Sequence, residues 1–308
     1  MRHARSLCSR TPILAALLLV IAPSWADEVT VPAPDRDDRL LRLAPADQAI
    51  ARDMTAFISR MEEKYFARVE RMNGAISNEF LTRVTDDTDY VVRVTRGDKV
   101  AKAGSMIALG KLQQPGRPSP GPLVWSRFYS LDVHAKTPLV GMLHATVVTQ
   151  FYEGGQSFAG GWLGIMNGTR SAEDMAAISA VVDAHFTRYG ASPKLYRRLM
   201  VKGTEDTMPE FRRRPDEAGV SFYGPPVFPG DTAKSYRFVS ELFDQFVGAY
   251  LDLIDKRAKD PFATADVTAK TVMEKRWLVD QLYSDPFASK LVPFDVWSLA
   301  NVPPAIQF

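Results

Sequence analysis

The chain has 308 residues, enough for one large domain or two small ones. Hydrophobic residues make up 46% of it and charged residues 24%, a globular composition that excludes wholesale disorder. The formal charge of +2 falls to about −1 once three arginines in the first 26 residues are removed. A near-neutral protein has no general attraction for nucleic acid or for an anionic membrane, so we expect neither as a partner.

The first 26 residues have the pattern of a secretory signal peptide. Three arginines precede the apolar run ILAALLLVIA, and the small residues Ser24 and Ala26 stand just before Asp27. The apolar run is shorter than the roughly 20 apolar residues that a membrane-spanning helix needs. We therefore expect cleavage after Ala26 and a periplasmic or secreted protein that is not held at the membrane. An uncleaved anchor is the alternative.

Cysteine usage limits the chemistry of the mature chain. The only cysteine, Cys8, lies within the signal segment, so the mature protein would contain none. This excludes disulfides, thiolate catalysis and thiolate metal sites. A metal site would need histidine and carboxylate ligands, and the mature chain has three histidines, His134, His144 and His185.

After the signal, the sequence predicts an exposed leader and then a long helix. Residues 27–45 are rich in proline and aspartate, which favours an extended, solvated segment. Apolar residues then recur at three- and four-residue steps from Ile50 to Val69, and Gly74 follows. This spacing predicts an amphipathic helix over about residues 46–73.

The middle of the chain changes to strand-like segments. Between residues 78 and 166, runs rich in β-branched and aromatic residues alternate with turn formers such as DDTD, RGD and QQPGRPSPGP. We expect about six strands here. Because the links between them are short, the strands should form an antiparallel sheet.

Helical patterns return in the last third of the chain. We expect helices over about residues 171–190, 192–203 and 231–259, whereas 268–285 fits a helix or a strand. Strands followed by helices, without regular alternation, indicate an α+β fold with a large antiparallel sheet flanked by helices. No shift in composition marks a second domain, so residues 46–308 are expected to form one.

No nucleotide-binding loop, nucleophile elbow or zincin motif is present in the sequence. The most distinctive polar pattern is the stretch SLDVHAKTPLVGMLH, residues 130–144, which carries two of the histidines. His134 and His144 are ten positions apart with Pro138 between them, so the two can share one face of neighbouring strands. They could form a working pair, or they could satisfy local hydrogen bonds in a strand-rich core.

The order of several short segments resembles the oxygen-dependent coproporphyrinogen III oxidase family. The resemblance covers about residues 78–304 and depends on seven collinear matches. They are GDKVAKAGSMIALGK, SLDVHAKTPLVGMLH, GGWLG, SPKLYRRL, AGVSFY, KRWLVDQLYSD and SLANVPP. The family has a large, flat antiparallel sheet between helices and is usually a homodimer. The resemblance therefore implies the same architecture and a homodimer here.

The resemblance also implies a reaction. Family members remove carbon dioxide from two propionates of a reduced tetrapyrrole in haem biosynthesis and leave vinyl groups, with molecular oxygen as the oxidant and no required cofactor. In this sequence His144 falls on the proposed proton donor, and Asp285 on a carboxylate proposed to engage the pyrrole N–H groups. His134 falls on a histidine proposed as a metal ligand in some members.

Three further positions are implied to contact the substrate. Ser130 falls on a substrate-contacting serine, Lys102 lies in the Lys-Ala-Gly strand, and Thr146 stands where the family has asparagine. Val148 stands where the family has an arginine that would hold a propionate, and valine cannot replace a bidentate guanidinium.

Other departures follow. The family's glycine-rich aspartate becomes Asn167 or Gly168, and Asp216 and Glu217 stand where cations are expected. These departures keep two alternatives open. The first is a non-catalytic binder of haem or another tetrapyrrole, with His134 or His144 as a ligand to iron. The second is a dimeric structural or partner-binding protein with a filled cleft.

Overall fold

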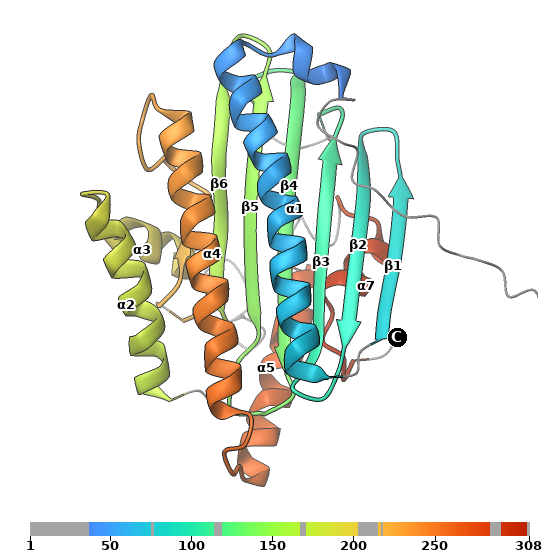
Figure 1. Ribbon diagram of the computed structural model, residues 1–308, viewed down its shortest axis with the longest axis vertical. Helices are drawn as coiled ribbons and strands as arrows, with labels where there is room; N and C mark the ends of the chain where they lie inside the picture. The colour runs from blue at the N-terminus through green and yellow to red at the C-terminus, as the bar shows by residue number, and fades with distance from the viewer. Residues whose placement is uncertain are drawn as a thin grey trace, which may run out of the picture.

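The computed structural model of the chain describes residues 37–74, 77–113, 119–166, 171–202, 215–216, 218–283 and 291–306. The expected signal peptide and residues 27–36 lie outside these ranges. One central sheet has α1 and α4 on its front face and α5 and α7 behind it (Figure 1). The predicted fold class, α+β with an antiparallel sheet flanked by helices, is confirmed.

The sheet has seven strands, each paired antiparallel to the next in chain order. The strands are β1 Ser77–Val84, β2 Thr88–Arg96, β3 Val100–Gly110, β4 Leu123–Ala135, β5 Leu143–Tyr152, β6 Ser157–Ile165 and β7 Val220–Ser221. The first six are the strands that the sequence predicts. The two-residue β7 carried no sequence signal of its own.

Two long helices cover the front face of the sheet. They are α1, Pro45–Asn73, and α4, Thr232–Arg257 (Figure 1). The apolar positions whose spacing predicts α1 are all buried from Ile50 to Val69, and Gly74 follows the helix with a φ of 77°. Because that backbone conformation favours glycine, the residue ends the helix where the sequence predicts.

The rear face is covered by α5, Thr264–Tyr283, and α7, Phe294–Asn301. Met273, Trp277 and Asp280 of α5 are all buried, at steps of four and three residues, which the helical period explains and strand alternation does not. The Trp277 ring stacks on Trp297 of α7 at 6.1 Å. These contacts build a second core behind the sheet and show that the ambiguous segment 268–285 is helical as far as it is described.

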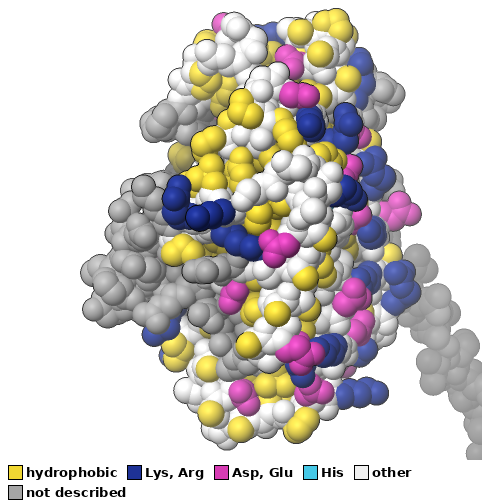
Figure 2. All heavy atoms as spheres, turned by 90° about the vertical axis from the view of Figure 1, so that its left-hand side faces the viewer, with side chains coloured by type: hydrophobic (Ala, Val, Ile, Leu, Met, Phe, Trp, Pro, Cys, Tyr) yellow, Lys and Arg dark blue, Asp and Glu magenta, His cyan; other side chains and the backbone are white. Residues whose placement is uncertain are grey.

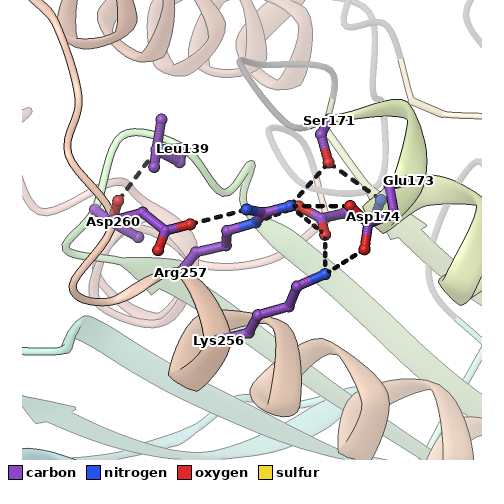
Figure 3. Close-up of polar contacts among 8 residues, drawn as sticks. Leu139, Ser171, Glu173, Asp174, Lys256, Arg257 and Asp260 are labelled. Carbon is purple, nitrogen blue, oxygen red and sulfur yellow. Dashed lines mark hydrogen bonds and ion pairs between the residues drawn. The ribbon is translucent and has the colours of Figure 1, made fainter.

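Two shorter helices, α2 Ala172–Arg188 and α3 Lys194–Lys202, lie beside the β6 edge of the sheet. A polar cluster ties the start of α2 to the end of α4 (Figure 3). Arg257 donates to both oxygens of the buried Asp174 at 2.8 and 2.9 Å, and Lys256 donates to one of them at 3.1 Å. The bidentate pair fixes the geometry of this corner.

A 3₁₀ helix, η2 Asp38–Arg42, precedes α1 and is anchored to the sheet. Leu40 is buried in the front core, and the Asp37 carboxylate accepts a hydrogen bond from Trp125 at 3.0 Å and one from Arg127. The C-terminal part of the stretch 27–45 is therefore packed against the domain, whereas the sequence predicts an exposed leader up to residue 45.

Figure 2 views the molecule from the side of α2 and α3. Basic and acidic side chains are interspersed on this side, with hydrophobic side chains exposed between them. None of the described helices is long and apolar enough to cross a membrane.

Candidate functional site

The residues predicted from sequence gather on the rear face of the sheet, towards α5 and α7. The strand registers place Lys102 of β3 opposite His134 of β4, and Ser130 of β4 opposite Thr146 of β5. His144 of β5 lies between these two pairs along the same face. Since side chains two residues apart in a strand share a face, the five residues form one patch. Asp285, the sixth, lies outside the described residues.

The centre of this patch is a chain of three polar side chains. His144 Nδ1 lies 2.8 Å from Asp132 Oδ1, and Asn301 at the end of α7 donates from Nδ2 to the other oxygen of Asp132. Asp132 is fully buried, whereas the His144 side chain is 19% exposed. The carboxylate favours the tautomer with a proton on Nδ1, which leaves Nε2 as the nitrogen available for proton exchange or for ligation.

Asp132 and Asn301 were missed by the sequence reasoning. A signal for Asp132 was present, because Ser130, Asp132 and His134 follow strand alternation and must share a face. No such signal exists for Asn301, since it reaches Asp132 across 169 positions of the chain.

Lys102 and His134 lie beneath the end of α7, where each is only 1% exposed. Lys102 Nζ donates to the Val302 carbonyl at 2.6 Å, and His134 Nε2 is 3.2 Å from the Asn301 carbonyl, to which it can donate. Burial lowers the pKa of Lys102 to about 7. Burial, reinforced by the charge of Lys102, also lowers the pKa of His134 well below its usual range.

This environment limits what His134 can do. Its Nε2 faces a backbone carbonyl, and its Nδ1 has no hydrogen-bond partner among the described residues. A ligand could reach the ring only if the turn after α7 moved. Within the described ranges, no three His, Cys, Asp or Glu side chains are grouped so as to hold a metal ion. A metal-binding role for His134 stays a prediction.

Ser130 and Thr146 continue the patch along β4 and β5. The Ser130 hydroxyl is fully buried and has no partner in the described part of the chain. Thr146 Oγ1 accepts the backbone N–H of Trp162 at 2.8 Å and lies 3.1 Å from the hydroxyl of Tyr223. Thr146 therefore positions Tyr223 at the far side of the patch, and Ser130 is the hydroxyl with unused hydrogen-bonding capacity.

A shallow cavity of about 40 Å³ opens on the same sheet face beyond Ser130 and Thr146. Its floor includes two cross-strand pairs of β4 and β5, Phe128 with Val148 and Ser126 with Gln150. Its full lining is Thr88, Tyr90, Ala108, Gly110, Leu112, Gln113, Leu123, Ser126, Phe128, Val148, Gln150 and Tyr223. Its volume leaves room for a few water molecules or for one small substituent of a larger ligand.

The cavity and the imidazole lie on the same face of the sheet. Val148 lies four residues along β5 from His144, or about 13 Å at the usual rise of a strand. The described residues that line the cavity include no Lys, Arg, Asp, Glu or His. Because Val148 itself lines the cavity, the arginine expected from the resemblance is absent from the point where it would face a ligand.

Comparison with known proteins assigns no family. No family model matches the chain, and no curated protein matches it either. The function must therefore be inferred from the residues of the rear face.

Proposed function

We propose that the protein is a divergent enzyme of the coproporphyrinogen oxidase type, in which His144 moves protons for a flat tetrapyrrole bound against the rear face of the sheet. The observation that carries this proposal is the hydrogen-bonded chain His144–Asp132–Asn301. Its buried carboxylate orients an imidazole through Nδ1 and leaves Nε2 available, as general acid–base catalysis requires. A homodimer and export by residues 1–26 belong to the same proposal.

The proposed reaction converts a propionate of the reduced tetrapyrrole into a vinyl group. One propionate carboxylate, dioxygen and one proton yield the vinyl group, carbon dioxide and hydrogen peroxide. The C–C bond to the carboxylate breaks, a C–H bond on the neighbouring carbon breaks, and the two electrons pass to oxygen. His144 Nε2 supplies the proton that the reaction consumes, and Asp132 holds the ring in place for the transfer.

A second candidate is a non-catalytic binder of haem or another tetrapyrrole. The neutral lining of the cavity favours it, because a substrate with four carboxylates gains no cationic partner there. His144 fits the requirement for an iron ligand, since Asp132 holds Nδ1 and leaves Nε2 to coordinate. His134 fits less well, because its Nε2 is occupied by the Asn301 carbonyl.

One experiment decides between these candidates. The mature chain is incubated in air with coproporphyrinogen III, and the extracted porphyrins are separated by chromatography. Vinyl-bearing products that disappear in His144→Gln support the enzyme. His185→Gln is the matched control, because His185 is bonded to Phe238 of α4 on the other side of the sheet.

If no vinyl-bearing product forms at a micromolar concentration of the protein, the enzymatic proposal is wrong. Haemin titration then tests the binder. A Soret shift that is lost in His144→Gln supports it, and an unchanged spectrum excludes both candidates.

A further inference from the structure

The floor of the rear-face cavity consists of a polar row and a mainly apolar row of residues. The strand registers set four small or polar residues side by side across β2 to β5: Thr88, Gly110, Ser126 and Gln150. Two positions away along each strand, on the same face, lies the second row: Tyr90, Ala108, Phe128 and Val148. Both rows line the cavity. A group that enters it therefore meets hydrogen-bonding side chains on one side and apolar side chains on the other.

Three side chains of the polar row are buried and have unused hydrogen-bonding capacity. Thr88 is 4% exposed, Ser126 is 6% exposed and Gln150 is 8% exposed. Within the described residues, Thr88 and Ser126 form hydrogen bonds through main-chain atoms alone, and the Gln150 amide forms none. Their polar atoms are not sealed inside the protein, so they open into the cavity that they line. Because buried polar groups are costly without partners, this row is suited to hold a hydrogen-bonding group.

The cavity offers no charge to such a group, since its described lining contains no Lys, Arg, Asp, Glu or His. An ionised carboxylate or ammonium would lose its hydration there without gaining an opposite charge. The group that fits is therefore uncharged and can form hydrogen bonds with the polar row.

Gln150 determines which uncharged group fits best. Its side-chain amide presents a carbonyl acceptor and N–H donors side by side. A primary carboxamide carries the same two groups and can face Gln150 in the reverse order, so that two hydrogen bonds form at once. A ketone can only accept. The hydroxyl of Ser126, directly opposite Gln150 across β4 and β5, supplies a further partner for the same group.

Gly110 leaves the centre of the polar row open. A Cβ at this position would lie 2.9 Å from Ser126 Cβ and 3.3 Å from Leu123 Cδ2, so a side chain here would displace Ser126. The cavity volume of about 40 Å³ suffices for about three water molecules or for one terminal group of that size.

We propose that this cavity is a binding site for a primary carboxamide group, which pairs with the amide of Gln150 while the carbon that bears it contacts Val148 and Phe128. The site is separate from the imidazole patch. Gln150 lies six residues along β5 from His144, or about 20 Å at the usual rise of a strand. The proposal therefore does not depend on the reaction at His144.

Titration of the mature chain with acetamide and with acetate tests the site, because the two probes have nearly the same shape and differ in charge and in their donors. NMR of the Gln150 side-chain amide and of the Val148 methyl groups follows binding. We expect saturable shifts of both signals with acetamide, and binding of acetate that is at least about tenfold weaker.

Two variants and a control locate the binding. Gln150→Leu keeps a similar size but removes the amide, and acetamide should bind at least about tenfold more weakly, measured at the Val148 methyl groups. Ser126→Ala adds no atoms and should weaken acetamide about threefold, which keeps the test valid if Gln150→Leu does not fold. Gln156→Leu, in the exposed link between β5 and β6, is the matched control and should bind acetamide as the wild type does.

Several results would overturn the proposal. They are the absence of acetamide binding at molar concentration, equal affinities for acetamide and acetate, shifts confined to residues outside the cavity, and undiminished binding in both Gln150→Leu and Ser126→Ala. None of these outcomes involves a tetrapyrrole, so the site and the function proposed for His144 are tested separately.

Discussion

Replacing Lys102 with methionine should change how stability depends on pH. Lys102 is 1% exposed, and its ammonium donates to a backbone carbonyl but forms no ion pair with a described carboxylate. Burial lowers its pKa from 10.5 to about 7. In the unfolded chain the same lysine stays protonated to about pH 10.4. Lys102→Met removes this difference while keeping a side chain of similar length.

The direction follows from proton linkage. Between about pH 7 and about pH 10 the unfolded state binds the extra proton, so the free energy of unfolding rises with pH in the wild type. Below about pH 7 Lys102 is protonated in both the folded and the unfolded state, and the free-energy cost of burying its charge is present in full. The difference between 10.5 and about 7, at about 1.4 kcal/mol per pH unit, corresponds to about 5 kcal/mol across the window.

Urea unfolding of both proteins at intervals from about pH 6 to about pH 10 measures the effect. Methionine leaves the Val302 carbonyl without its donor, which shifts the stability of the variant by an amount that does not depend on pH. The prediction therefore concerns the slope. The wild type should gain stability relative to Lys102→Met as pH rises, and the exposed Lys259→Met should run parallel to the wild type. If the free energy of unfolding depended on pH in the same way in Lys102→Met and in the wild type, the idea that the buried Lys102 deprotonates near pH 7 would be refuted.

Three further predictions concern other parts of the account. Asp132→Asn should lower kcat about 100-fold or more with little change in KM, because the imidazole loses its orienting carboxylate; steady-state kinetics measure this, and an unchanged kcat would contradict it. Asp174→Asn should lower the free energy of unfolding by about 3 kcal/mol at neutral pH. Burial alone would raise the pKa of Asp174, but hydrogen bonds led by that of Arg257 outweigh burial and lower the pKa. The loss of unfolding free energy in Asp174→Asn, measured by urea unfolding, should therefore shrink as the pH falls towards 3. A loss that does not depend on pH would contradict this. Gly104→Ala should destabilise by at least about 1–3 kcal/mol, since its new methyl would lie 2.1 Å from the Ala300 carbonyl oxygen; a variant with the wild-type melting temperature would show that α7 is free to shift.

Local periodicity predicted much of the fold. The three- and four-residue spacing from Ile50 to Val69 located α1, and short turn-rich links located six antiparallel strands. The predicted start of a helix at about residue 171 also matches the structure, where the Ser171 hydroxyl caps α2 by accepting the N–H of Asp174. These features depend on residues that are close in the sequence, where pattern and physical cause coincide.

Long-range contacts were beyond such patterns. The packing of Asp37 on Arg127 joins residues 90 positions apart, so the composition of the leader gave no sign of it. The patch at His144 was partly predictable, because strand alternation groups His134 and Ser130 on one face. Its completion by Asn301 was not, since only the docking of α7 on the sheet brings the two together.

The central claim is that a tetrapyrrole engages the rear face through Nε2 of His144. The mature chain has only three histidines, so nitrogen NMR of protein labelled in its imidazoles can follow each of them. On addition of coproporphyrin III, which cannot react further by this route, the account predicts a large shift of His144 Nε2. His185 on α2 should not move. A bound porphyrin that shifts His185 or no histidine at all would contradict the claim.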